Sequence, residues 1–339
     1  MQTICNWTGS SNSPRSGRFE LTVSLSWIRA FLASITVPIR SLYRRPASCH
    51  LVLLLAIFLP IWKVQAAPRK LRVLTSFLPL YCFTANVAGE FAEVENLLPP
   101  GMEPHDFQLS PREMKRIAAA DLLVVNGLGL EAWLDKVINS STENKTVVLA
   151  SQGISGELIR PRGTDDSVRS LPNPHLWLDP CLAAIMIQNI LAGLQKADPS
   201  HAAEFAHQAT LYLSILTRLD ADLKAALGAF HDQPILTYHD AFPYFARRYG
   251  LRIAGVLEET PEVPPSARHL AALANIIRTE KVSVIFSEHG SSPRLPQMMG
   301  RDYHMQVAIL NTLETGDLKP EAYEVGMRQN LQTLKDAWK

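Results

Sequence analysis

The chain has 339 residues, of which 47% are hydrophobic and 19% are charged, and its formal net charge is +1. Such a composition can bury an apolar core, which excludes an intrinsically disordered chain. A nearly balanced charge argues against a nucleic-acid-binding protein, because that function needs a strongly basic face.

The N-terminal end has the pattern of an export signal. Residues 51–62, LVLLLAIFLPIW, form an uncharged apolar run that follows a group of arginines and precedes the small residues of KVQAAP. This order predicts a signal peptide with an N-terminal extension over residues 1–66, cleaved near Ala66 or Ala67. The run is shorter than the about 20 residues that a membrane anchor needs. We therefore expect an exported, periplasmic protein that is net acidic after cleavage.

From residue 71 onward, short β-branched runs alternate with helical stretches, which predicts parallel sheets with crossover helices. A helix predicted from Pro111 has two start signals, Ser110 as its capping residue and Glu113 three positions further on. Residues 151–173 are rich in Gly, Ser and charge, and they predict an exposed loop. An N-terminal α/β lobe is therefore expected over residues 68–197, with strands at 71–77, 92–98, 121–127 and 146–150 and further helices at 80–89 and 130–138.

The strongest helical pattern lies at residues 200–229, where apolar residues recur at three- and four-residue spacing. At 1.5 Å per residue, about 30 residues reach roughly 45 Å, which is longer than a small domain is wide. We therefore predict that residues 198–231 form a helix that joins two lobes. Its recurring apolar residues are Phe205, Ala209, Tyr212, Leu216, Leu219, Leu223 and Leu227.

The alternation of strands and helices then resumes and predicts a C-terminal α/β lobe over residues 232–339. The expected strands are at 234–239, 251–257, 282–288 and 306–311, and the expected helices end at Gly250, span 266–279 and 293–300, and start at about Glu321. The predicted fold class is therefore α/β, with two parallel-sheet lobes joined by one long helix.

Several polar residues follow the predicted strands, and ligands of open parallel sheets bind beyond the carboxyl ends of the strands. Neutral imidazole is a strong ligand for Zn²⁺, and three imidazoles with one oxygen make a four-coordinate site. The sequence therefore predicts a metal site, with the fourth donor left open. Its candidate ligands are His105, His175 and His239, with Glu288 or Asn311 as the oxygen donor.

Metal-binding histidines also need a partner for the second ring nitrogen. The candidates for this role are Asp106, Asp179 and Asp240, each close in sequence to one of the three histidines. His289 is ambiguous because it adjoins Glu288. A zinc hydrolase is an alternative function, since three histidines with an open fourth position also describe catalytic zinc, with Glu288 as the general base.

Four stretches of the chain carry a family resemblance. They are LPPGMEPHDFQLSPREMKRIAAADLLVVNGLGLEAWLDK, NPHLWLDP, ADPSHAAEF and LTYHDAFPYFARRYGL. Over about residues 71–338 the chain resembles the periplasmic or surface metal-ion-binding proteins that deliver zinc or manganese to ABC importers. The resemblance implies two Rossmann-like lobes bridged by a long helix, with one metal ion in the cleft and limited lobe movement. It also implies a monomeric, non-enzymatic carrier of Zn²⁺ that meets an ABC permease.

By motif position, the resemblance places His105, His175 and His239 as metal ligands. Manganese-type relatives commonly have Glu at the third position, so His239 favours zinc. The family's fourth ligand is often an Asp after the last strand, whereas this chain has Asn311 there. The fourth position is therefore open to Asn311, Glu288, His289 or water, and a manganese or iron carrier is the alternative to a zinc carrier.

Overall fold

The structure is a computed structural model that describes residues 69–105, 107–134, 146–160, 171–259 and 263–338. The predicted signal peptide at 1–66 lies outside the described residues, as does the middle of the loop predicted at 151–173. Contacts divide the chain between Arg69 and Lys70, and the fold below is that of Lys70–Lys339. Across the parts of the chain that the structure describes, no helix combines the length and apolar character needed to cross a membrane.

The first lobe contains a four-stranded sheet in which all neighbouring strands are parallel. The strand order is β2-β1-β3-β4, so the chain crosses over a face of the sheet between strands. Its elements are β1 (Leu71–Thr75), α3 (Leu78–Ala88), η2 (Gly89–Phe91), β2 (Ala92–Asn96), α4 (Pro111–Ala119), β3 (Leu122–Val125), η3 (Ala132–Leu134) and β4 (Thr146–Leu149). Every residue of β3 is buried, as expected for a central strand of a sheet with both faces covered.

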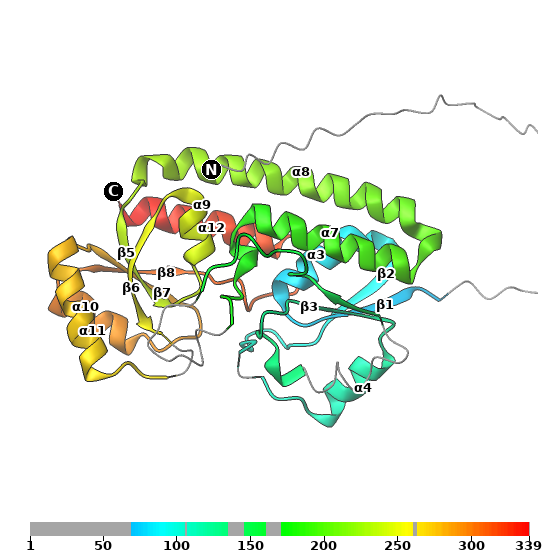
Figure 1. Ribbon diagram of the computed structural model, residues 1–339, viewed down its shortest axis with the longest axis horizontal. Coiled ribbons are helices and arrows are strands. Elements are labelled where there is room, and N and C mark those ends of the chain that lie inside the picture. Colours follow the sequence, from blue (N-terminus) through cyan, green and yellow to red (C-terminus); the bar gives the residue numbers. More distant parts are fainter. Residues whose placement is uncertain (1–68, 106, 135–145, 161–170, 260–262, 339) are drawn as a thin grey trace, which may run out of the picture. The chain divides into compact units, whose positions relative to one another are not determined.

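The second lobe repeats this topology. Its sheet has the order β6-β5-β7-β8 and is again parallel throughout. Its elements are β5 (Pro234–His239), α9 (Pro243–Tyr249), β6 (Arg252–Glu258), α10 (Ala267–Glu280), β7 (Val284–Glu288), α11 (Arg294–Asp302), β8 (Gln306–Leu310) and α12 (Ala322–Ala337). In Figure 1 the two sheets lie in separate lobes, with helices beside each.

Two helices lie between the sheets in sequence, α7 (Pro180–Ala197) and α8 (Ala202–Leu227), with η4 (Leu176–Leu178) and η5 (Pro199–His201) before them. The 26 residues of α8 reach roughly 39 Å at 1.5 Å per residue. Helix α8 packs against α3 and α7 of the first lobe and against α9 and α12 of the second, as its course in Figure 1 illustrates. All seven recurring apolar residues predicted for this helix are buried.

Local start and stop signals act as the sequence predicts. The Ser110 side chain accepts a hydrogen bond from the backbone N–H of Arg112. The Glu113 carboxylate accepts one from the backbone N–H of Ser110, which completes a capping box at the start of α4. Helix α9 ends at Gly250, whose φ of 72° is in the left-handed region that glycine adopts without strain. These residues determine where α4 begins and where α9 ends.

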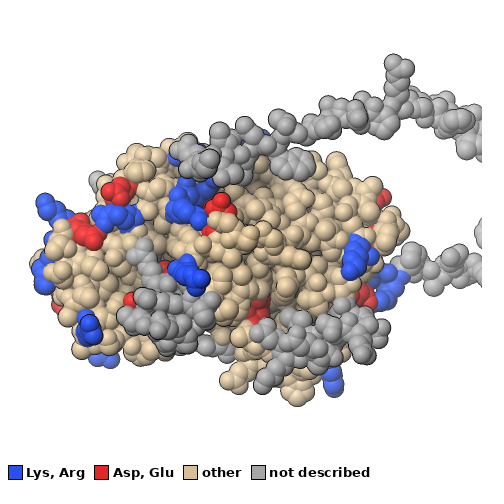
Figure 2. Space-filling model, viewed as in Figure 1, with Lys and Arg blue, Asp and Glu red and all other residues tan. Residues whose placement is uncertain are grey.

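The core joins the two lobes. One apolar cluster includes Leu123 of the first sheet, Leu219 of α8 and Phe286 of the second sheet. On the face drawn in Figure 2, basic and acidic side chains are interspersed among uncharged residues. The predicted fold class is confirmed: two α/β lobes with parallel sheets joined by one long helix.

Candidate metal centre

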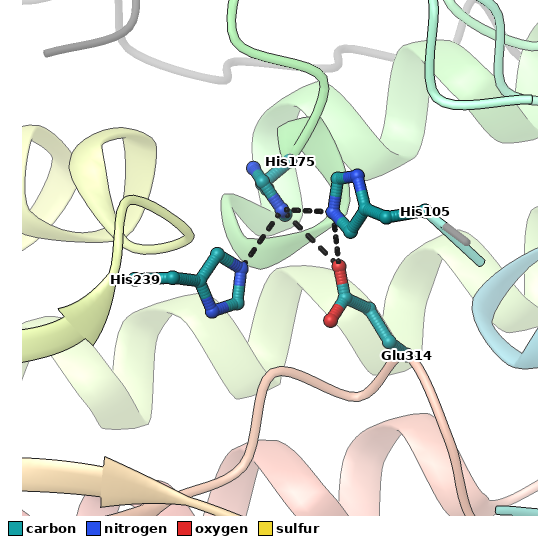
Figure 3. A group of neighbouring side chains, drawn as sticks. All are labelled: His105, His175, His239 and Glu314. Carbon is teal, nitrogen blue, oxygen red and sulfur yellow. Dashed lines mark hydrogen bonds and ion pairs between the residues drawn. The ribbon is translucent and has the colours of Figure 1, made fainter. Parts of the chain in front are cut away.

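Four side chains converge between the carboxyl ends of the two sheets (Figure 3). His105 lies in the connection from β2 to α4, and His175 stands directly before η4. His239 is the last residue of β5, and Glu314 follows β8 after a short turn. Each lobe therefore contributes two of the four groups. His239 is at the carboxyl end of a strand, and the other three lie in loops that follow strands.

The atoms that these side chains turn toward one another are closely spaced. The Nε2 atom of His175 lies 3.3 Å from Nε2 of His105, 3.2 Å from Nε2 of His239 and 3.1 Å from Oε1 of Glu314. Nε2 of His105 lies 3.3 Å from the same Glu314 oxygen, and all four atoms lie within 4.8 Å of one another. A tetrahedral zinc site with bonds of about 2.0–2.1 Å has edges of about 3.3–3.4 Å. These four separations are close to the edges of such a site, and the other two are no longer than 4.8 Å.

Burial makes this an enclosed polar cluster. His175, His239 and Glu314 are buried, while His105 is partly exposed. Desolvation lowers the pKa of His175 to about 4, so its ring is neutral at pH 7 and can donate a lone pair. Burial would raise the pKa of Glu314, but its close contacts with His105 and His175 hold the pKa well below the usual range. The cluster therefore offers an ionised carboxylate beside imidazole nitrogens.

The far-side nitrogens of two histidines have partners of their own. Nδ1 of His175 lies 2.8 Å from Oδ1 of Asn173, and the amide of Asn173 donates to the backbone oxygen of Asp240 at 2.6 Å. Nδ1 of His239 makes a short contact with Glu288. The other Glu288 oxygen accepts the backbone N–H of His239 at 3.2 Å. These contacts turn both Nε2 atoms inward, as metal-binding histidines require.

The contact with Glu288 also sets the charge of His239. Burial by itself lowers the pKa of His239. The adjacent Glu288 carboxylate has the larger, opposite effect, and the pKa is raised to about 10. His239 is therefore protonated at neutral pH in the absence of a cation. A metal ion that binds Nε2 has to displace that proton.

The two oxygen donors predicted from sequence lie elsewhere. Glu288 is occupied with the far side of His239, and it does not stand among the four inward-facing atoms. Oδ1 of Asn311 accepts the backbone N–H of Leu313 at 2.8 Å, which closes the turn after β8. That turn, with Leu313 at a left-handed φ of 65°, brings Glu314 into the cluster. Glu314 lies three residues beyond Asn311, the first polar residue after β8.

The predicted partners of the histidines fall in three different places. Asp240 is linked to His175 through Asn173, whose amide donates to the Asp240 backbone oxygen. Asp179 caps α7 by accepting the backbone N–H of Cys181 at 2.9 Å. Asp106 lies outside the described residues. His289 is exposed and is not a member of the cluster.

One acid that the sequence analysis did not single out borders the cluster. Glu103 precedes His105 by two residues, and burial together with the neighbouring Glu314 raises its pKa to about 8. The carboxyl group of Glu103 is therefore mostly protonated at pH 7, so it adds little negative charge beside Glu314. The polar environment of Glu314 thus comes from both lobes.

Comparison with known proteins places the chain among zinc-uptake components. The family model for ZnuA, described as zinc-uptake complex component A, periplasmic, matches residues 73–337. The high-affinity zinc uptake system protein ZnuA of Bacillus subtilis is 31% identical over 281 residues, which cover 79% of this chain and 88% of that protein. The zinc-binding protein AdcA of Streptococcus pyogenes serotype M18 is 31% identical over 295 residues, which cover 80% of this chain. The match spans 57% of the length of AdcA.

Solved structures with different metals have a similar fold. Zn(II)-bound AdcA from Streptococcus pneumoniae superposes with a TM-score of 0.67 at 28% identity, covering 79% of this chain and 58% of that one. The solute-binding protein FpvC from Pseudomonas aeruginosa in complex with Mn²⁺ superposes with a TM-score of 0.72, also at 28% identity, covering 79% of this chain and 98% of that one. The shared fold thus accommodates more than one divalent cation.

Proposed function

Because the chain belongs to the ZnuA family of periplasmic zinc-uptake components, we propose that it captures Zn²⁺ outside the cytoplasmic membrane and delivers the ion to an ABC permease. In this role the ion is cargo. The protein has to hold it selectively and then release it, without changing it chemically.

The proposed ligands are His105, His175, His239 and Glu314. The observation that carries this assignment is the convergence of four inward-facing atoms. Four of their six separations are 3.1–3.3 Å, close to the edges of a zinc tetrahedron, and all six are within 4.8 Å. Three imidazole nitrogens and one carboxylate oxygen form a donor set of the kind found in protein zinc sites. In this proposal Glu314 takes the place considered for Glu288 and Asn311.

The donor count separates a carrier from a hydrolase. Catalytic zinc sites have three protein ligands and keep the fourth position for water or substrate. Here a fourth protein oxygen, from Glu314, stands with the three histidines. Glu288, the acid considered as a general base, is instead held against His239. We therefore favour a non-enzymatic carrier.

Manganese or iron is the alternative cargo. The FpvC structure in complex with Mn²⁺ keeps this alternative open for the fold. The donor set argues for zinc, because Mn²⁺ prefers oxygen ligands and binds nitrogen-rich sites less tightly than Zn²⁺ does. One carboxylate among three imidazoles is a nitrogen-rich site.

The location follows from the family and from the N-terminal sequence. The family model describes a periplasmic component, and residues 1–66 have the pattern of a signal peptide. We propose export to the periplasm and action as a monomer. N-terminal sequencing of the protein isolated from the periplasm should give a start near Ala66 or Ala67, and retention of residues 1–66 would contradict this.

Equilibrium binding tests the proposed function. Titration of the purified protein against a competing chelator should give one tightly bound Zn²⁺ per chain. His105→Ala should weaken binding strongly. The matched control is His207→Ala, which removes an exposed imidazole on α8 and should leave the affinity unchanged. Failure of the unaltered protein to bind Zn²⁺, or equal affinity in the two variants, would refute the proposal.

A further inference from the structure

Trp177 packs against His175 of the candidate metal centre and makes hydrogen bonds between the two lobes. Its indole N–H donates to the backbone oxygen of Thr312 at 2.8 Å. Its own backbone oxygen accepts the hydroxyl of Tyr323 at 2.7 Å. Trp177 belongs to the first lobe, whereas Thr312 and Tyr323 belong to the second. All three side chains are buried, so both bonds are shielded from water.

The positions of these residues in the chain relate Trp177 to two of the inward-facing groups. His175 lies two residues before Trp177, and Glu314 lies two residues after Thr312. The single turn of η4 connects His175 to Trp177 and leaves little freedom between them. The bond from Trp177 to Thr312 therefore ties the loop that carries His175 to the loop that carries Glu314.

Aromatic packing holds the indole ring in place. The ring of Trp177 meets that of Phe77 edge to face, with ring centroids 4.7 Å apart. The ring of His175 also packs against the indole, with ring centroids 5.1 Å apart. An indole confined by two rings keeps its N–H directed at Thr312, because rotating it would disrupt both contacts.

We propose that Trp177 is a positioning residue that sets the separation of His175 and Glu314 and thereby favours Zn²⁺ over larger divalent cations. This inference rests on the proposed function, since it concerns the same four ligands. The separation concerned is the 3.1 Å between Nε2 of His175 and Oε1 of Glu314. Zn²⁺ fits four donors at about 2.0–2.2 Å. A looser pair of loops fits Zn²⁺ less well and admits extra oxygen donors, which suits Mn²⁺ better.

Trp177→Phe tests the inference, because it keeps an aromatic ring and removes the N–H. We expect the affinity for Zn²⁺ to fall by roughly 10- to 100-fold, the usual cost of losing a group that orients a ligand. The affinity for Mn²⁺ should fall less, so the Zn²⁺ to Mn²⁺ affinity ratio should decrease. Simple destabilisation lowers both apparent affinities by the same factor and leaves the ratio unchanged. The visible absorption of bound Co²⁺ should also weaken as the site departs from a tetrahedron.

Trp338→Phe is the matched control. The indole nitrogen of Trp338 is buried without a hydrogen-bond partner among the described residues, so this substitution deletes an N–H that ties nothing together there. The affinity ratio of this variant should equal that of the unaltered protein. If Trp177→Phe does not fold, Tyr323→Phe removes the other bond to Trp177 and should lower the ratio in the same direction.

The outcomes separate the two proposals. If the unaltered protein binds no Zn²⁺, the proposed function fails. If it binds Zn²⁺ and the affinity ratio of Trp177→Phe matches that of Trp338→Phe, the function stands and the role assigned to Trp177 is wrong. With Tyr323→Phe as the only folded variant, an unchanged ratio overturns the role in the same way.

Discussion

At the scale of single residues, the identity of the oxygen donor decides what the site can bind. Glu314 is buried and ionised, and its Oε1 faces His105 and His175. Glu314→Gln keeps the shape of the side chain but removes the charge. We expect Zn²⁺ affinity to fall by at least the roughly 10-fold that loss of an orienting group costs, as measured by chelator competition.

Asn311→Asp is the companion test, because it introduces a carboxylate where the sequence resemblance placed the fourth ligand. Oδ1 of Asn311 accepts the backbone N–H of Leu313, and an aspartate can accept the same bond. The Zn²⁺ to Mn²⁺ affinity ratio should therefore remain as in the unaltered protein. A shift of that ratio toward Mn²⁺ would place residue 311 at the metal and would argue against Glu314.

Proton release on metal binding should report the state of His239. Burial lowers the pKa of His239, but Glu288 outweighs this and brings it to about 10. Zn²⁺ binding at pH 7 should then release about one proton. Because the ion competes with that proton, affinity should rise about tenfold per pH unit up to pH 10 and fall as the pH decreases. Calorimetry in buffers with different ionisation enthalpies measures the proton count.

Glu288→Gln removes the charge that raises the pKa of His239. Fewer protons should be released at pH 7, and the dependence of affinity on pH should become shallower. Equal proton release from the unaltered protein and from Glu288→Gln would show that His239 is not the titrating group.

The residues of the site were predictable to different degrees. His105, His175 and His239 could be predicted because ligands of parallel sheets gather beyond the carboxyl ends of the strands. Glu314 was harder to predict, because a local turn after β8, with Asn311 bonded to the backbone of Leu313 and Leu313 at a left-handed φ, decides which side chain reaches the cluster. The orientation of Glu288 could not be predicted either, because the sequence does not show that its carboxylate contacts Nδ1 of His239 and not Nε2.

At the scale of helices and strands, the sequence predicted the long joining helix and all eight strands of the two sheets. Helix α8 has a regular buried stripe, and its recurring apolar residues identified both the helix and its packing face. Helix α7 was not predicted, although it has 18 residues. It packs against strands of the first sheet as well as against α8 and α3. Its buried residues also recur at three- and four-residue spacing, from Leu182 to Leu194, so its sequence carries the same helical signal as α8.

The start of α7 couples helix capping to pH. Asp179 caps this helix, and burial raises its pKa from 3.8 to about 6. The folded chain thus favours the protonated form, so Asp179 adds stability below about pH 3.8, and this contribution is lost as the pH rises through about 6. The difference between the two pKa values corresponds to at most about 3 kcal/mol.

Asp179→Asn should remove this part of the pH dependence. Asparagine is an equally good capping residue and carries no charge to bury. Arg248 loses only a distant contact of 3.9 Å with Asp179 and keeps its 2.5 Å ion pair with Asp220. Relative to the unaltered protein, the variant should gain stability between pH 4 and pH 7 in urea titrations. A constant difference across that range would mean that Asp179 does not titrate there.

At the scale of the whole described chain, the two lobes have the same strand order and one apolar cluster extends through both, while a second cluster lies within the second lobe. In the orders β2-β1-β3-β4 and β6-β5-β7-β8, the loops after the corresponding strands β4 and β8 each bring one side chain, His175 and Glu314, to the candidate metal centre. Helix α8 contributes to the common core, and Trp177 ties the two lobes together near the ligands. The sequence predicted two lobes and a joining helix, but only packing in three dimensions shows that the lobes are not independent.

A shared core implies cooperative unfolding. Leu219 is buried in α8 within the cluster that includes both sheets. Leu219→Ala should lower the free energy of unfolding by about 2–5 kcal/mol, and it should shift one transition that both lobes undergo together. Leu211→Ala is the matched control, since Leu211 is 49% exposed on the same helix, and it should change stability by less than about 0.5 kcal/mol.

Added Zn²⁺ should raise the midpoint of the unfolding transition in the unaltered protein and in both variants, because a ligand held by both lobes binds only the folded chain. Two separate transitions in the unaltered protein, of which only one responds to Leu219→Ala, would show that the lobes fold independently.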